Sequence, residues 1–326
     1  MVRWLGWVLL TLMAALGVTY FGMDLFREPL DEAARTRALH EGKGAHFVRL
    51  PVGTMHVRVS GPADGPVVLL VHGGSVGGYG YQHWQKPLAD AGFRVVVPDL
   101  LGYGYSDRPN VPYAKAFYIA QLNQLLDALE IKAPVHIVGA SMGGAIVTGV
   151  TASAPSRIKS VTLVAPSGNG PTNAVSRWLL TPIIGDWAFH VLGPTLNGRM
   201  LTKAYEHTRD REGMAAWMHE QTRFRGYAEG ILNTLRNYDT NWQPDDYEAL
   251  GRTGLPVLAV WGTADAIVPY AQSKLLAQHV PQLKLVSLEG KSHALAFGET
   301  DLVLESVIPF LKEVDQRTSQ QSGPNP

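Results

Sequence analysis

The sequence predicts a doubly wound α/β fold with a mostly parallel sheet, because two kinds of segment alternate along the chain. Short runs rich in valine and leucine have the composition of parallel strands that are buried on both faces. Longer amphipathic stretches lie between them, and strand–helix alternation of this kind builds a parallel sheet. The predicted parallel strands are residues 67–71, 94–97, 135–138, 161–165, 257–261 and 283–288.

Two further elements complete this pattern. Residues 46–50 and 55–59 alternate in polarity around a turn at 52–54, which is typical of a hairpin. Residues 114–131 place their apolar side chains on one broad face and therefore predict a helix. Ligands of such sheets bind beyond the carboxyl ends of the strands, so the segments that follow the strands are the place to look for chemistry.

The chain begins with an apolar segment over residues 4–23 that contains no charged side chain. At a rise of about 1.5 Å per residue, a helix of this length spans about 30 Å, the thickness of the hydrocarbon core of a bilayer. Trp4, Trp7 and Tyr20 lie near its ends, where amphipathic rings favour the interface. We expect residues 1–24 to form a single-pass membrane anchor. The alternatives are a cleaved signal, which gives a secreted or periplasmic protein, and a buried helix.

Composition argues against several kinds of partner. The 28 basic residues balance 28 acidic residues among 326, whereas a nucleic-acid-binding protein usually carries a basic excess. The chain has no cysteine and no HExxH motif, so a metal site has little support. We therefore expect no nucleic-acid partner, no metal and no cofactor. The basic residues on both sides of the apolar segment leave the orientation in the membrane open.

The strongest chemical signal is a GxSxG motif, formed by Gly139, Ser141 and Gly143 between a predicted strand and a helix. A serine on so sharp a turn adopts a strained backbone and projects its hydroxyl from the sheet, and residues two before and two after it must be small. The same turn places the N–H of Met142 at the start of a helix, where it favours an oxyanion. This context indicates a nucleophile.

With this motif in place, the chain resembles the α/β-hydrolase family over about four-fifths of its length. The sequence HGGS after residues 67–71 is similar to the oxyanion loop of the family, and Gly74 or Ser75 would supply the second N–H. Residues 99–106 read DLLGYGYS and are similar to a second family loop, DxxGxGxS. We interpret His72 and Asp99 as braces of these loops.

A serine hydroxyl needs a positioned imidazole to accept its proton. The family's chain order of serine, acid and histidine implies His293 as this base, since it follows the last predicted strand. It implies Asp265, four residues after the strand at 257–261, as the acid that orients the imidazole. Asp301 and Glu299 are weaker candidates because both follow the histidine.

The resemblance also implies a helical cap, which would occupy residues 166–250. The hydrolase core would then consist of residues 46–165 and 251–314, preceded by a linker at 25–45 and followed by a disordered tail at 315–326. We expect most aromatic and large apolar side chains of the cap to pack within it and the rest to line an apolar pocket. These side chains are Trp178, Trp187, Phe189, Tyr205, Trp217, Met218, Phe224, Tyr227, Tyr238 and Trp242.

Together these features predict a serine hydrolase that cleaves a carboxylic ester with an apolar, uncharged acyl or alcohol group through an acyl-enzyme. Dehalogenases and epoxide hydrolases of the family carry aspartate at the position of Ser141. Carbon–carbon bond hydrolases remain an alternative, although they usually have asparagine and tryptophan where this chain has Ala140 and Ala294. A cofactor-free perhydrolase or haloperoxidase shares the same triad. A membrane-tethered ligand receptor or scaffold is the alternative without catalysis.

Overall fold

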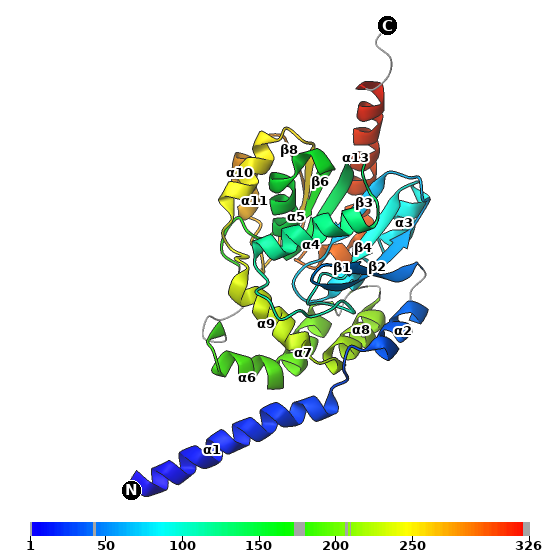
Figure 1. Cartoon of the computed structure of the whole chain (residues 1–326). Coiled ribbons are helices and arrows are strands. Elements are labelled where there is room, and N and C mark those ends of the chain that lie inside the picture. The colour runs from blue at the N-terminus through cyan, green and yellow to red at the C-terminus, as the bar shows by residue number, and fades with distance from the viewer. Residues whose placement is uncertain (1, 42–43, 173–179, 206–207, 209, 322–326) are drawn as a thin grey trace.

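The computed structural model describes residues 2–41, 44–172, 180–205, 208 and 210–321 (Figure 1). Its centre is an eight-stranded sheet in the order β1-β2-β4-β3-β5-β6-β7-β8. The strands are β1 Ala45–Leu50, β2 Gly53–Ser60, β3 Val67–Val71, β4 Arg94–Pro98, β5 Val135–Ala140, β6 Ile158–Val164, β7 Val257–Gly262 and β8 Leu283–Leu288.

The sheet is antiparallel at one edge and parallel over the rest. Strand β2 pairs antiparallel with β1 and with β4, while all pairs from β4 to β8 are parallel. The carboxyl ends of the parallel strands therefore meet on one side of the sheet. The predicted hairpin and the predicted mostly parallel sheet are both confirmed.

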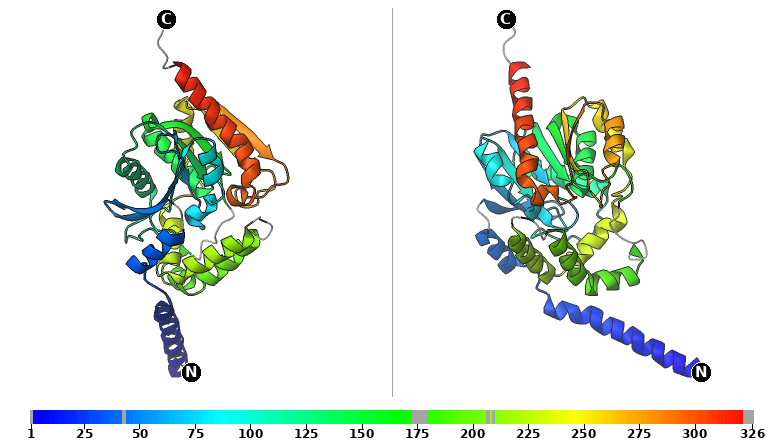
Figure 2. Two further views of the ribbon diagram at one scale, coloured as in Figure 1. Left: turned by 90° about the vertical axis from the view of Figure 1, so that its right-hand side faces the viewer. Right: turned by 180° about the vertical axis from the view of Figure 1, so that it is seen from behind.

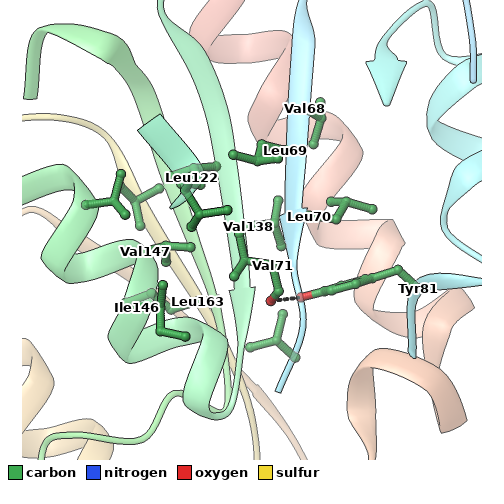
Figure 3. Close-up of a cluster of buried hydrophobic side chains, with 14 of the residues drawn as sticks. Val68, Leu69, Leu70, Val71, Tyr81, Leu122, Val138, Ile146, Val147 and Leu163 are labelled. Carbon is green, nitrogen blue, oxygen red and sulfur yellow. Dashed lines mark hydrogen bonds between the residues drawn. The ribbon is translucent and has the colours of Figure 1, made fainter. Parts of the chain in front are cut away.

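Helices cover both faces of the sheet. On one face lie α4 Lys115–Ala128 and α5 Met142–Ser153, and Figure 3 shows Leu122, Ile146 and Val147 beside Val138 of β5. The other face carries α3 Gln85–Asp90 and α13 Thr300–Gln321 (Figure 2). Burying apolar side chains on both faces stabilises the fold by roughly 25 cal/mol per Å² of apolar surface.

The segment between β6 and β7 forms the cap and returns to the core. Its helices are α6 Ile184–Val191, α7 Gly193–Ala204, α8 Arg211–Arg223, α9 Tyr227–Asn237 and α10 Pro244–Arg252. The last of these packs against α5 and against α11 Gln272–His279, so it belongs to the helical layer of the core. The predicted cap, which ends at residue 250, therefore includes most of a helix that covers the sheet.

The N-terminal part contains α1 Val2–Met23, the short η1 Asp24–Phe26 and α2 Glu32–Glu41. Helix α1 projects from the body (Figures 1 and 2). Residues Trp4–Phe26 are long and apolar enough to cross a membrane, although a signal sequence has the same length and composition. The predicted linker at 25–45 includes α2, whose Ala34 and Ala38 are buried.

Helix α13 reaches Gln321 and closes the described chain. The tail predicted from residue 315 is therefore helical in its first part, because the apolar face of α13 packs on β6 and β7 well before that point and the helix simply continues. Residues 322–326 lie outside the described residues.

Candidate active site

The site begins at the turn between β5 and α5, where Ser141 adopts φ 53° and ψ −121°. Hydrogen bonds hold this uncommon conformation on both sides of the residue. The N–H of Ser141 donates to the Val164 carbonyl at 2.9 Å, and its carbonyl accepts from Gly144 at 2.9 Å and from Ser167 at 3.0 Å. Surrounding contacts of this kind are needed to retain a strained residue. The hydroxyl is thereby aimed out of the sheet.

The glycines of the motif are required by space around this turn. A Cβ on Gly139 would lie 2.3 Å from the Gly143 carbonyl oxygen, and a Cβ on Gly143 would lie 2.2 Å from the Val71 carbonyl oxygen. Both neighbours are backbone atoms that cannot rotate away. The turn thus packs directly against the strand that leads into the HGGS loop.

Ser141, His293 and Asp265 come together although they lie on three separate loops. The Ser141 hydroxyl lies 2.9 Å from Nε2 of His293, and Nδ1 of His293 lies 2.7 Å from Oδ2 of Asp265. The other carboxylate oxygen accepts from the backbone N–H groups of Ile267 and Val268, each at 2.9 Å. Asp265 therefore accepts hydrogen bonds at both carboxylate oxygens, which fixes its orientation toward His293.

The three predicted oxyanion residues lie in the same cavity wall as Ser141. Met142 is the first residue of α5, where a backbone N–H has no acceptor within the helix. Gly74 and Ser75 lie in the loop after β3, and a Cβ on the preceding Gly73 would lie 3.2 Å from Cβ of Ser141. The loop thus approaches Ser141 more closely than an ordinary side-chain contact allows.

His72 fixes this loop through both ring nitrogens. Nδ1 lies 2.7 Å from the Gly73 carbonyl, and Nε2 accepts from the Leu100 N–H at 2.9 Å. Burial lowers the pKa of His72, although Asp99 and the Gly73 carbonyl act in the opposite direction. The ring is therefore held neutral, with a proton on Nδ1.

Asp99 holds the neighbouring loop together. Its carboxylate accepts from the Gly78 N–H at 2.7 Å, from Nδ1 of His56 at 2.8 Å and from the Tyr105 N–H at 3.1 Å. Burial by itself raises the pKa of this carboxyl, but the His56 hydrogen bond and nearby positive charge, including Arg58, hold it well below its usual range.

A cavity of about 580 Å³ opens over Ser141, between the sheet and the cap. Among the described residues, its wall contains no lysine, arginine, aspartate or glutamate. Apolar side chains such as Tyr205, Ile231 and Phe297 dominate it, while Asn197 and Thr234 supply polar groups. This volume and lining suit an uncharged, largely apolar ligand.

The predicted cap aromatics divide as follows. Trp217, Phe224 and Tyr227 pack inside the cap or against the core, and Tyr205 lines the cavity. Trp242 is exposed. Trp178 lies outside the described residues.

Some predicted candidates do not join the site, and other residues were not predicted. Glu299 binds the ammonium group of Lys291 at 2.9 Å instead of His293. His56 was not predicted, because strand alternation alone gives no sign that both faces of β2 are covered. Within the described part of the chain, no group of three or more histidine, aspartate or glutamate side chains could hold a metal ion.

The comparisons with known proteins agree with this architecture. A family profile described as alpha/beta hydrolase fold matches residues 66–300. A haloalkane dehalogenase from Mycolicibacterium paratuberculosis is 30% identical over 237 residues, covering 70% of this chain and 76% of that protein. The 2-hydroxy-6-oxononadienedioate/2-hydroxy-6-oxononatrienedioate hydrolase of Klebsiella pneumoniae is 29% identical over 294 residues, covering 87% and 98%.

Solved structures show the same fold. A bromoperoxidase from Bacillus anthracis has a TM-score of 0.69 at 23% identity and covers 82% of this chain and 99% of its own. A bacterial membrane phospholipase A has a TM-score of 0.65 at 20% identity and covers 97% and 99%. Given the family match over most of the chain, this chain belongs to the α/β-hydrolase family.

Proposed function

We propose that this hydrolase cleaves carboxylic esters, with Ser141 as nucleophile, His293 as general base and acid, and Asp265 as the group that orients the imidazole. The observation that carries the proposal is the unbroken chain of hydrogen bonds from the strained serine to the buried carboxylate. A hydroxyl in contact with a neutral imidazole can lose its proton as it attacks. The enzymatic function is favoured over a receptor or scaffold because a ligand-binding role needs no such arrangement.

The reaction would proceed in two halves. Ser141 Oγ attacks the ester carbonyl carbon while its proton passes to Nε2 of His293, and the N–H groups of Met142 and of Gly74 or Ser75 hold the oxyanion. The C–O bond to the alcohol breaks, and His293 returns the proton to the leaving oxygen. Water then attacks the acyl-serine in the same way, releasing the acid and regenerating the hydroxyl.

Serine as nucleophile supports ester cleavage over halide displacement. A carboxylate that displaces halide forms an ester, which water can cleave, whereas a serine hydroxyl would form an ether. An ether has no carbonyl to attack, so the enzyme would not turn over. The similarity to a haloalkane dehalogenase therefore supports the fold and not the reaction.

The cavity lining supports an uncharged substrate over the substrates of the carbon–carbon bond hydrolases. The names of those relatives specify carboxylate substrates, a dienoate and a dienedioate. A buried carboxylate needs a charged or strongly donating partner. The described cavity wall offers no lysine or arginine for this purpose.

We also propose that α1 is retained as a membrane anchor. Its C-terminal part contacts the body, because the Trp187 indole donates to the Leu16 carbonyl and to the Thr19 hydroxyl, each at 3.1 Å. Tyr20 stacks on His190 with ring centroids 4.2 Å apart. Signal cleavage near residue 17 would remove part of this contact.

Labelling with a fluorophosphonate tests the proposed function directly, because this reagent reacts only with an activated serine. We expect Ser141 to be labelled and short p-nitrophenyl esters to be hydrolysed. Ser141→Ala should abolish labelling and lower kcat by about 10³-fold or more. Ser153→Ala, at the far end of α5, is the matched control and should change neither. Equal labelling of the Ser141→Ala variant would contradict the assignment.

A further inference from the structure

The cap exposes a set of apolar side chains along α6 and α7. Ile183 is 82% exposed, Leu196 59% and Met200 57%, and Ile184 and Leu192 are exposed as well. Leu196 and Met200 are four residues apart and share one side of α7, and Leu192 lies one turn before Leu196, where α6 joins α7. We call these five residues the cap patch. Single exposed apolar side chains are ordinary, but a set of this size on adjoining helices indicates an interaction surface.

The cap patch lies beside the candidate membrane span. Helices α6 and α7 occupy the same end of the molecule as α1, opposite the C-terminus (Figures 1 and 2). The Trp187 contacts join α6 to Leu16 and Thr19. These residues lie within roughly 10 Å of the end of the helix at Met23, at a rise of about 1.5 Å per residue. A spanning α1 would therefore hold α6 at the level of the membrane surface.

The surface between the anchor and the cap has the composition of an interfacial segment. Phe21, Leu25 and Phe26 are exposed where α1 joins the body. Arg199 is exposed between Leu196 and Met200, and it has no ion-pair partner among the described residues. Asp186, the acidic side chain of α6, is paired with Arg236. Apolar side chains beside an exposed cation suit the boundary of acyl chains and anionic headgroups.

The same surface borders the catalytic cavity. Met200 belongs to the cap patch and also lines the cavity, as does Asn197 of the same helix. An apolar molecule that leaves the bilayer at α7 would therefore reach the cavity without crossing water. The uncharged lining described above suits such a molecule.

We propose that the cap patch inserts into the membrane surface and that the substrate is a membrane-dissolved amphiphile carrying a long-chain acyl ester. This inference rests on the proposed ester hydrolysis for the identity of the substrate, whereas the insertion of the cap does not. The reaction adds one water to the ester and releases a fatty acid and an alcohol.

The insertion is tested without activity by site-specific fluorescence. Because the chain has no cysteine, Leu196→Cys introduces a unique thiol that can carry a bimane label. Leu275→Cys on α11 is the matched control, since Leu275 is an exposed leucine outside the cap. With full-length protein in vesicles, lipids brominated in the acyl chains should quench the label at position 196 at least twofold more than the label at position 275. Equal quenching at the two positions would overturn the insertion, and so would disulfide-linked dimers of unlabelled Leu196→Cys, which indicate a second copy on the patch.

The substrate is tested with two esters and full-length protein. The pair Ile184→Glu and Leu196→Glu should lower hydrolysis of a long-chain acyl ester in anionic vesicles by about tenfold or more, because charged side chains oppose insertion. Hydrolysis of a water-soluble p-nitrophenyl ester should stay within about twofold, since neither residue lines the described cavity. The control pair, Leu275→Glu and Leu285→Glu, should change neither rate. An unchanged rate of the cap variant in vesicles would overturn delivery of the substrate from the membrane. If the label at position 196 is quenched but the wild-type protein cleaves neither ester, the ester hydrolysis alone is rejected.

Discussion

His72 and His293 line the same cavity, but their hydrogen bonds differ in whether they allow proton transfer. Nε2 of His293 faces a hydroxyl, which can give and regain a proton. Both nitrogens of His72 face backbone groups, and its Nε2 accepts from the N–H of Leu100. A proton on that nitrogen would point at another N–H. His72 is therefore limited to holding the loop after β3 in place, and only as a neutral ring.

This restriction predicts a pH dependence of stability. Burial lowers the pKa of His72 in the folded state, while the unfolded chain titrates near its ordinary value of about 6.5. Below that value the unfolded state binds more protons than the folded state. The stabilisation is therefore complete above about pH 6.5 and is lost as the pH falls, by up to about 1.4 kcal/mol per pH unit.

Chemical denaturation of wild type and His72→Gln in detergent at pH 7.5 and 5.5 measures this effect. Glutamine does not titrate in this range, so the variant should lose less stability between the two pH values than wild type does. Asp99 interacts with His72, but its pKa lies well below its usual range, so it stays ionised at both pH values. Titrating groups that do not interact with His72 contribute to both proteins alike. Equal losses would show that His72 is not the group responsible.

The turn between β5 and α5 is limited by how closely two elements approach. Any side chain at Gly143 meets the Val71 and His72 carbonyl oxygens, which belong to β3 and to the oxyanion loop. Ser141 and the loop that follows β3 therefore share one close contact. A change at this position moves both together.

Gly143→Ala and Gly149→Ala separate this contact from helix propensity, since both glycines lie in α5. The Cβ of the first would lie 2.2 Å from a backbone oxygen, whereas the nearest atom to the second is a side-chain oxygen of Asp246 at 3.3 Å. We expect Gly143→Ala to lower kcat for a soluble ester by at least about tenfold and to lower stability by about 1–3 kcal/mol. Gly149→Ala should be neutral or stabilising by up to about 1 kcal/mol. Similar effects of the two variants would refute the steric explanation.

The elements that could be predicted are those whose own residues show their surroundings. All strands of the sheet were predicted near their observed places, but the run at 161–165 corresponds to β6 beginning at Ile158. The missing residues include Ser160, which is buried and lies 2.7 Å from Nδ1 of buried His136. A buried polar residue that bonds to a residue on another strand breaks the apolar run of its own strand. The run alone therefore does not predict that such a residue is buried.

The site shows the same limit. Ser141 and its glycines could be recognised because their spacing along the chain encodes the turn. The brace of His56 on Asp99 could not, since it depends on α2 and Phe224 covering the outer face of the hairpin. The alternation of polar and apolar residues along one strand does not indicate which distant segment covers either of its faces.

At the scale of the whole molecule, the anchor and the cap are joined by a buried cluster around His190. Arg27 donates to Nε2 of the His190 ring at 3.3 Å and also to the His190 carbonyl oxygen, while Nδ1 of the same ring donates to Glu229 of α9. Arg27 and His190 are both almost fully buried. Next in the chain, Glu28 pairs with Arg223 and Arg37. The segment after the apolar helix is therefore part of the folded body.

This junction determines where the anchor can be removed. Deleting Met1–Met23 leaves Arg27 and Glu28 in place, so the remaining chain should be soluble and should keep the rate of wild type on a water-soluble ester within about twofold. Deleting Met1–Arg27 leaves the carbonyl oxygen and a ring nitrogen of buried His190 without the guanidinium that binds them, at a cost of about 1–3 kcal/mol. Thermal unfolding of the two truncated proteins measures the difference.

Full-length protein should remain with membranes after a carbonate wash or a high-salt wash, because salt screens surface charge but does not weaken an apolar span. The protein shortened at Met23 supplies the matched comparison, since it keeps the cap patch and the buried Arg27. If it still sediments with vesicles at low salt, the cap patch binds lipid without the anchor, as the exposed Arg199 and its apolar neighbours lead us to expect. Recovery of the full-length chain in the soluble fraction would contradict the anchor. A mature N-terminus near Val18 would instead identify the segment as a cleaved signal, and the cap would then have to find the membrane by its patch alone.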